Sequence, residues 1–288
     1  METSELLKKV RKIEIKTRGL SRNIFAGEYH SAFKGRGLTF SEVREYQPGD
    51  DIRTIDWKVT ARYNNPFVKI FQEERELTLM LLVDVSDSEQ FGTQGWFKRE
   101  MLTEIAGVLA FSALQNNDKI GVIFFSDKIE KFIPPQKGKL HVLRIIRELI
   151  DFKPEGQGTD IAGALKYFSN VIRKRATVFL ISDFIGNDFE DAMKSVRSRH
   201  DLIAMQVFDP REMELPSIGL MKVRDAETGQ ERWLDTSRKK IRTHYKATWL
   251  KARNELEQFL KKQGIDFISL RTDRDYVVPM MNFFKSRF

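Results

Sequence analysis

The chain has 288 residues, of which 41% are apolar and 11% aromatic, and it contains no cysteine. A chain of this length and composition buries a sizeable core in one large or two smaller domains, which excludes an intrinsically disordered protein. The lack of cysteine excludes disulfides, Cys-ligated zinc, iron–sulfur clusters and thiol nucleophiles. The net charge is +8, and residues 222–262 alone hold 12 basic against 6 acidic side chains.

Two features of the sequence bear on localisation. The first residues, METSELLKKVRKIEIK, carry charges throughout, unlike the apolar region of a secretory signal. The longest apolar runs, LTLMLLVDV and ATVFLIS, have the length of strands and fall far short of the ~20 residues that cross a bilayer. The sequence therefore predicts a cytoplasmic protein with no transmembrane segment.

Residues 1–76 are predicted to form an N-terminal helix and a small β-rich module. Apolar residues recur at roughly helical spacing between residues 2 and 26, and a glycine-rich loop follows. From Leu38 the pieces LTFSEVREY, RTIDWKVTARY and FVKIFQEERE have the texture of short strands, separated by the turns QPGDD and NNP. We expect two or three antiparallel strands whose aromatic residues, Trp57 among them, pack on a neighbouring element.

Residues 77–288 are predicted to form an α/β domain with a doubly wound, mostly parallel sheet and helices on both faces. The run LTLMLLVDV is typical of a strand that is covered on both sides, and strands alternate with helices after it. An insertion at about 210–262 interrupts this pattern. It reads as a hairpin followed by a long basic helix at about 237–263.

Three loops with oxygen-bearing side chains leave elements at the predicted carboxyl edge of the sheet, where open α/β sheets bind ligands. Taken singly, each loop is explained as a helix N-cap or a turn. Together they predict one shared site for Mg²⁺ or Mn²⁺, ions that prefer oxygen ligands and keep several waters. The expected metal ligands are Asp84, Ser86, Ser88, Thr159 and Asp183.

The pattern Asp84-x-Ser86-x-Ser88, followed by Thr159 and Asp183, resembles the metal-ion-dependent adhesion site of von Willebrand factor A domains. The preceding stretch is similar to a bacterial domain-of-unknown-function family, in which such a module precedes a von Willebrand A-like domain. Members of that family are commonly encoded beside MoxR-type AAA+ ATPases. The residues that carry the second resemblance include Arg36, Asp50, Asp51, Arg53, Asp56, Trp57 and Arg62.

The resemblance implies a function without catalysis. In adhesion sites of this kind one coordination position stays open, and a carboxylate of the protein partner fills it. The resemblance thus implies a metal-dependent protein-interaction module that serves as an adaptor for a MoxR-type AAA+ ATPase, in protein maturation or chaperone-like work.

The charged segment between Pro48 and Arg62 has two interpretations. Asp and Arg at short spacing usually form ion pairs and turn contacts that fix a loop, and this structural interpretation leads. The alternative is a functional one: a second recognition surface for a partner, or an internal carboxylate that covers the metal site.

Two other function classes compete with the interaction module. Asp84 and Asp183 on one Mg²⁺ could serve a phosphohydrolase or nuclease, but Ser86 stands where a haloacid-dehalogenase-like site has a second Asp. The basic helix at 237–263 could bind nucleic acid or a membrane surface. We expect neither activity.

Overall fold

The computed structural model describes residues 39–63, 65–72, 77–86, 98–156, 158–186, 188–224 and 231–287, together with Gly19. The expected helix within residues 2–26 and the turn of the expected hairpin lie outside these residues. The chain divides into two compact units. One is formed by Phe33–Leu77, and the other contains Thr78–Phe288 together with Met1–Ala32.

The unit Phe33–Leu77 contains one antiparallel strand pair and two short helices. Strand β1 (Thr39–Glu45) pairs with β2 (Phe67–Gln72). Between them lie the 3-10 helix η1 (Ile52–Thr54) and helix α3 (Trp57–Tyr63). Two of the three expected strand pieces are therefore confirmed, and the prediction of a strand for RTIDWKVTARY is wrong.

A side-chain cap explains why this third piece is helical. Oδ1 of Asp56 accepts hydrogen bonds from the backbone N–H groups of Lys58 at 3.0 Å and Val59 at 3.3 Å, which satisfies the first turn of α3. Trp57 opens this helix and is 68% exposed, so its side chain does not belong to the core of the unit Phe33–Leu77.

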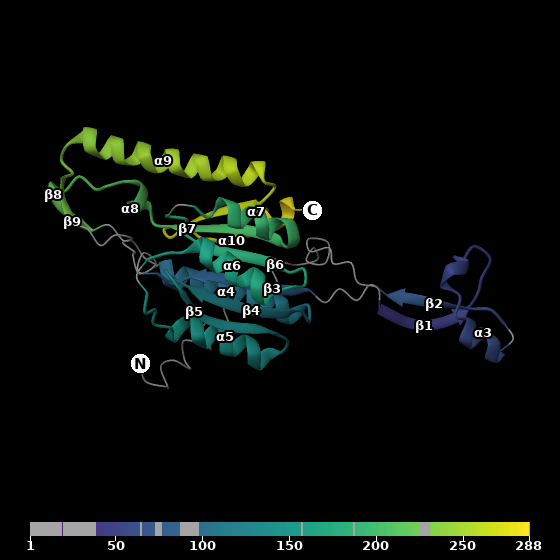
Figure 1. The fold of residues 1–288 in the computed structure, drawn as a ribbon. Coiled ribbons are helices and arrows are strands. Elements are labelled where there is room, and N and C mark those ends of the chain that lie inside the picture. The colour runs from purple at the N-terminus through teal and green to yellow at the C-terminus, as the bar shows by residue number, and fades with distance from the viewer. Residues whose placement is uncertain are drawn as a thin grey trace. The chain divides into compact units, whose positions relative to one another are not determined.

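The unit that begins at Thr78 is built on a six-stranded sheet in the order β10-β7-β6-β3-β4-β5 (Figure 1). Five of the strands are parallel, whereas the edge strand β5 is antiparallel to β4 and carries Pro134 and Pro135. The predicted doubly wound, mostly parallel sheet is confirmed. The strands are β3 (Thr78–Asp84), β4 (Lys119–Phe125), β5 (Ile129–Gln136), β6 (Thr177–Ser182), β7 (Asp201–Phe208) and β10 (Asp266–Arg271).

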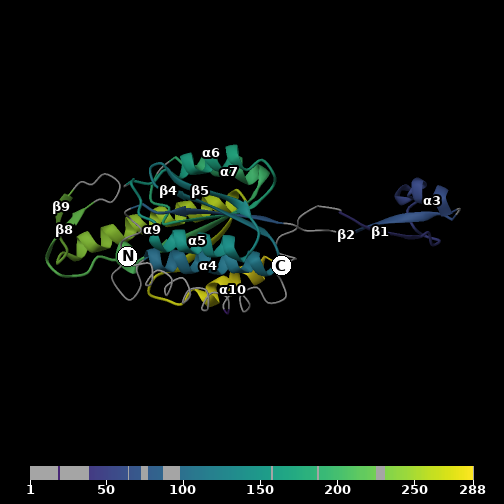
Figure 2. The same cartoon turned by 90° about the horizontal axis from the view of Figure 1, so that it is seen from below.

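Helices cover both faces of this sheet (Figure 2). Helices α6 and α7 pack with Met80, Leu82 and Leu180 on one face, and α4, α5 and α10 lie on the other. Strands β3 and β6 are buried along nearly their whole length, as their apolar sequences predict. The helices are α4 (Lys98–Gln115), α5 (Lys139–Asp151), α6 (Ile161–Val171), α7 (Glu190–Arg199) and α10 (Val277–Ser286).

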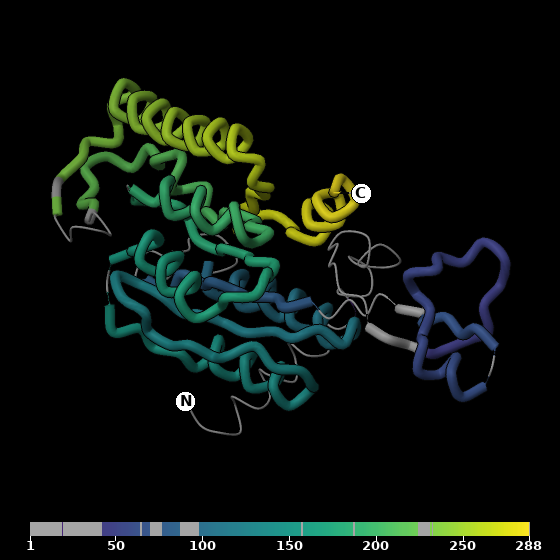
Figure 3. The backbone as a smooth tube through the Cα atoms, turned by 45° about the vertical axis from the view of Figure 1, so that its right-hand side comes forward, coloured from purple at the N-terminus to yellow at the C-terminus, as the bar shows by residue number. Residues whose placement is uncertain are grey.

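The insertion after β7 begins with a short helix, α8 (Pro210–Met213), which the sequence pattern did not indicate. The expected hairpin is formed by β8 (Leu220–Arg224) and β9 (Glu231–Asp235). The expected long helix is α9 (Lys239–Lys262), which leads back to the sheet at β10 (Figure 3).

Candidate functional site

The candidate site begins where two neighbouring parallel strands, β3 and β6, end side by side. Asp84 is the last residue of β3 and is fully buried. Its Oδ1 accepts a hydrogen bond from the backbone N–H of Ser86 at 3.0 Å. Its Oδ2 accepts a 2.7 Å hydrogen bond from the hydroxyl of Ser182, which ends β6. The polar ends of the two strands are thus joined directly.

The loop before α6 brings Thr159 to the same place. The hydroxyl of Thr159 donates to Oγ of Ser86 at 3.0 Å. The next residue, Asp160, donates its backbone N–H to the carbonyl of Ser126 just after β4, at 2.7 Å, and its side chain accepts from the N–H of Gly163 at 2.8 Å. Asp160 therefore caps α6, which leaves Thr159 to face Ser86.

Asp183 follows Ser182 and is also buried. Its Oδ1 accepts from the backbone N–H of Ile185 at 3.0 Å. Burial, and next the negative charge of Asp183, raise the pKa of Asp84 to about 7. The two acidic groups therefore lie at the same edge of the sheet and repel each other.

Sequence reasoning missed a cation beside Asp183. Lys98, the first residue of α4, is fully buried, and its Nζ lies 2.9 Å from Oδ2 of Asp183 and 2.6 Å from Oε1 of Glu212. Burial raises the pKa of Glu212 to about 7, against the lowering influence of Lys98. The sequence held one signal for this ion pair. A lysine in the first turn of a helix interacts unfavourably with the helix dipole, so it is stabilised by a nearby acidic side chain.

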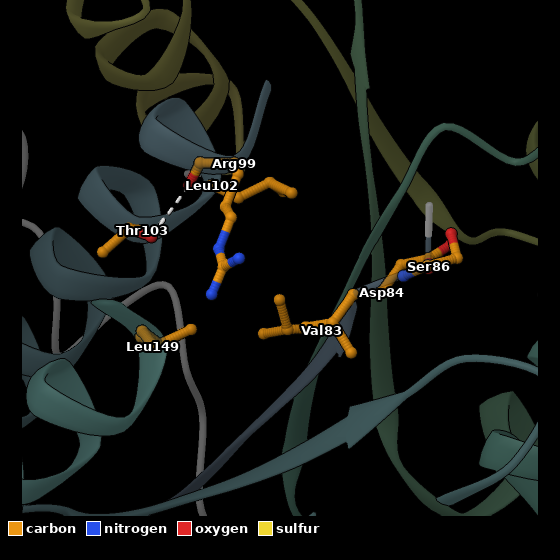
Figure 4. A pocket seen from close by; sticks show the side chains of 8 residues that line it. Val83, Asp84, Ser86, Arg99, Leu102, Thr103 and Leu149 are labelled. Atoms are coloured by element: carbon orange, nitrogen blue, oxygen red, sulfur yellow. Dashed lines mark hydrogen bonds between the residues drawn. The ribbon is translucent and has the colours of Figure 1, made fainter. Parts of the chain in front are cut away.

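A small pocket lies between α4 and the end of β3 (Figure 4). Its lining includes Asp84 and Ser86 on the strand side and Arg99 on the helix side, and Figure 4 shows the guanidinium group of Arg99 directed toward Leu149 and Val83. Arg99 also donates a hydrogen bond to the carbonyl of Phe152.

The structure places the expected metal ligands as follows. Asp84, Ser86 and Thr159 are joined by hydrogen bonds, and Asp183 lies beside them at the end of the adjacent strand. Ser88 lies outside the described residues.

The second set of predicted residues lies in the unit Phe33–Leu77. Arg36 falls outside the described residues. Asp50 accepts two 2.7 Å hydrogen bonds from Arg44, which hold the pKa of this carboxyl below its usual value. Asp51 caps η1 through the N–H of Arg53. These two acidic side chains fix turns, as expected if the charged segment between Pro48 and Arg62 has a structural role.

The remaining members of this set include one residue with a structural role and three with exposed side chains. The carboxylate of Asp56 caps α3 and lies 3.5 Å from Nζ of Lys69. The side chains of Arg53, Trp57 and Arg62 are exposed. An exposed cationic and aromatic set of this kind is what the alternative interpretation, a recognition surface, requires.

The donor chemistry of the site fits a hard divalent ion. Asp84, Ser86, Thr159 and Asp183 offer only oxygen atoms, the ligand type that Mg²⁺ prefers. Within the described part of the chain there is no group of three or more His, Cys, Asp or Glu residues that could hold a metal. Such an ion would therefore have two carboxylates and a few hydroxyls as protein ligands, in competition with Lys98 for Asp183.

The chain is 29% identical to "Uncharacterized protein Rv1480" of Mycobacterium tuberculosis over 292 aligned positions, which cover 100% of this chain and 91% of that protein. A solved structure of BatB from Bacteroides thetaiotaomicron is 14% identical with a TM-score of 0.48, over 73% of this chain and 98% of that one.

A second solved structure corrects the expected localisation. It is described as an aerotolerance-related membrane protein from Bacteroides fragilis, 18% identical, with a TM-score of 0.49, over 73% of this chain and 98% of that one. The prediction of a cytoplasmic protein is contradicted by this likeness and is withdrawn. Within the described residues, no helix is both long enough and apolar enough to span a bilayer.

The family assignment comes from a match over most of the chain. Residues 42–255 match the model of one protein family, and this span includes both the charged turns around Asp50 and the site around Asp84. The chain therefore belongs to the family described as "Protein of unknown function DUF58".

Proposed function

We propose that this protein is a non-enzymatic, metal-dependent protein-interaction module. The observation that supports the proposal best is the chain of hydrogen bonds from Thr159 through Ser86 and Asp84 to Ser182, which gathers oxygen donors from three elements at one edge of the sheet. In the proposal, Mg²⁺ or Mn²⁺ takes its protein ligands from Asp84, Ser86, Ser88, Thr159 and Asp183.

A carboxylate of the partner would complete the coordination of this ion. Two carboxylates and a few hydroxyls leave a divalent cation with much of its charge, so it attracts an external acidic group. The guanidinium of Arg99, which lines the same pocket as Asp84 and Ser86, adds a positive charge on the side of α4.

The partner in this proposal is a MoxR-type AAA+ ATPase, and the pair would act in protein maturation or chaperone-like work. The family resemblance of the segment around Asp50–Arg62 supports this choice. The exposed side chains of Arg53, Trp57 and Arg62 would give the ATPase a second contact surface on the unit Phe33–Leu77.

A pull-down tests the function directly. The bait is the full chain, and the prey is the purified MoxR-type ATPase from the same genome, in buffer with either Mg²⁺ or EDTA. We expect the wild-type chain to retain the ATPase in Mg²⁺ and lose it in EDTA, and Asp84→Ala to lose it in both. Asp191→Ala, which removes an exposed carboxylate of α7, is the matched control and should behave as wild type. Equal retention in Mg²⁺ and EDTA would contradict the metal dependence.

A further inference from the structure

The candidate site already contains a positive charge that belongs to the protein. Lys98 is fully buried and its ammonium lies 2.9 Å from Asp183 and 2.6 Å from Glu212. A buried ammonium is costly unless its surroundings pair it, and these two carboxylates do so. Lys98 therefore belongs to the candidate site and is not only the first residue of α4.

The acidic groups around Lys98 come from three different elements. Asp84 ends β3, Asp183 follows β6, and Glu212 lies in α8. The other oxygen of Glu212, Oε2, accepts a hydrogen bond from the backbone N–H of Asp209 at 3.2 Å, and this capping box fixes the carboxylate. Asp183 and Glu212 thus share one fixed cation, whose removal would leave these two carboxylates mutually repulsive, with Asp84 beside Asp183.

Both oxygens of Asp183 accept hydrogen bonds within the protein, one from Ile185 and one from Lys98. Both oxygens of Asp84 are likewise used, by Ser86 and Ser182. The site is therefore satisfied internally, and no exogenous ion is needed to keep its acidic groups in place. An ion that used Oδ2 of Asp183 would approach the ammonium of Lys98 and be repelled by it.

We propose that Lys98 is the built-in counter-ion of the candidate metal site: it fixes Asp183 against Glu212 when no ion is bound, and it lowers the affinity for a divalent cation. This inference rests on the proposed function, because the cation is the one assigned there to Asp84 and Asp183. It adds a regulatory consequence. Binding of the ion is kept weak and reversible, and a partner's carboxylate is needed to stabilise it.

The first test needs no metal. Lys98→Met preserves the length of the side chain and removes its charge, so Asp183 and Glu212 become unpaired. In EDTA we expect its melting temperature to fall by roughly 10 °C. The double variant Lys98→Met/Glu212→Gln should recover part of this loss, because one uncompensated charge is gone. Lys166→Met, at an exposed position of α6, is the matched control and should melt as wild type.

The second test measures the binding of Mn²⁺ alone by calorimetry or by the melting-temperature shift. We expect Lys98→Met to bind Mn²⁺ at least tenfold more tightly than wild type, since the competing charge is absent. Glu212→Gln should bind it more weakly, because Lys98 then pairs with Asp183 alone. If Lys98 only stabilised the fold of the site, both Lys98→Met and Glu212→Gln would bind Mn²⁺ more weakly than wild type. Glu212→Gln also keeps the test decisive if Lys98→Met does not fold.

The outcomes separate this inference from the proposed function. If Asp84→Ala abolishes Mn²⁺ binding but Lys98→Met leaves it unchanged or weaker, the counter-ion inference is overturned and the metal-dependent function stands. If no variant binds Mn²⁺, yet Lys98→Met is destabilised and rescued as described, the metal-dependent function fails and the counter-ion role in the ion-free protein is supported. An unchanged melting temperature of Lys98→Met in EDTA would overturn the inference whatever the ion does.

Discussion

The hydroxyl of Ser182 donates a 2.7 Å hydrogen bond to Oδ2 of Asp84, although the two residues are 98 positions apart. The same hydroxyl oxygen accepts the backbone N–H of Phe184 at 3.1 Å. Ser182 thus links the end of β3 to the turn that positions Asp183. Because φ of Phe184 is 58°, in the left-handed region, this turn has few alternatives and depends on such contacts.

Replacement of Ser182 by Ala should therefore destabilise the protein. A buried carboxylate loses its donor, which typically costs about 1.5–3 kcal/mol in the free energy of unfolding. Denaturant unfolding monitored by circular dichroism measures this loss. Ser195→Ala, at an exposed position of α7, is a suitable control and should leave the midpoint unchanged. Equal stability of the two variants would contradict a stabilising role for the Ser182–Asp84 hydrogen bond.

The contribution of Asp84 to the stability of the ion-free protein should fall as pH rises from about 4 to 7. The pKa of Asp84 increases from 3.8 to about 7 on folding, so the folded state binds the proton more tightly than the unfolded chain. This contribution is fully present below pH 3.8 and is lost as pH passes through 7. It amounts to at most about 4 kcal/mol for a shift of this size.

Asp84→Asn isolates this effect, because Glu212 titrates in the same direction. In EDTA, the variant should show a flatter dependence of unfolding free energy on pH than wild type. An identical slope for both proteins would assign the pH dependence to other groups.

Thr159→Ala should separate metal binding from folding. Thr159 is partly exposed, and its hydroxyl donates to Ser86 at 3.0 Å, so its loss in the ion-free protein should cost only about 1 kcal/mol. In the proposed ion-bound state the same hydroxyl is a ligand, and we expect the melting-temperature shift produced by Mg²⁺ to shrink or vanish. A full Mg²⁺ shift in the variant would remove Thr159 from the ligand set.

Tyr276→Phe tests a contact far from the predicted ligands. The hydroxyl of Tyr276 donates to Oε2 of Glu104 at 2.9 Å, and both side chains are buried, joining the residue before α10 to α4. Removal of the hydroxyl takes a donor from a buried carboxylate and should cost about 1–3 kcal/mol in thermal or denaturant unfolding. Tyr63→Phe, at a residue that is 67% exposed, should show no loss.

Trp57→Ala should leave the melting temperature nearly unchanged. Trp57 is 68% exposed, so the change removes little buried surface, and exposed substitutions usually stay within about 0.5 kcal/mol. Val68→Ala, at a residue that is only 2% exposed, is the matched core variant and should be clearly destabilised. A large fall in the melting temperature of Trp57→Ala would instead support the original prediction that Trp57 packs on a neighbouring element.

The sheet could be predicted from sequence because its strands are nearly continuous apolar runs, and LTLMLLVDV forms β3 as expected. The short helix α3 could not, because a β-branched and aromatic composition favours a strand, whereas the cap from Asp56 decides the backbone locally. A helix of seven residues spans only about two turns, so the spacing of its apolar residues does not distinguish it from a strand.

The site was predictable only in part, for a similar reason. Asp84 ends β3, Thr159 lies just before α6 and Asp183 follows β6, so topology brings them to one edge. Lys98 was missed because lysine is normally exposed, and its partner Asp183 is 85 positions away in the chain. Only the tertiary structure shows that α4 starts next to the turn after β6.

The two prolines of β5 affect how readily the protein can aggregate through the edge of its sheet. An edge strand offers unpaired N–H and C=O groups, which another chain can use to extend the sheet into an aggregate. Pro134 and Pro135 have no N–H, so this stretch of the free edge cannot pair with a foreign strand over its full length. The β5 edge is therefore a poor template for intermolecular β-structure during synthesis and folding.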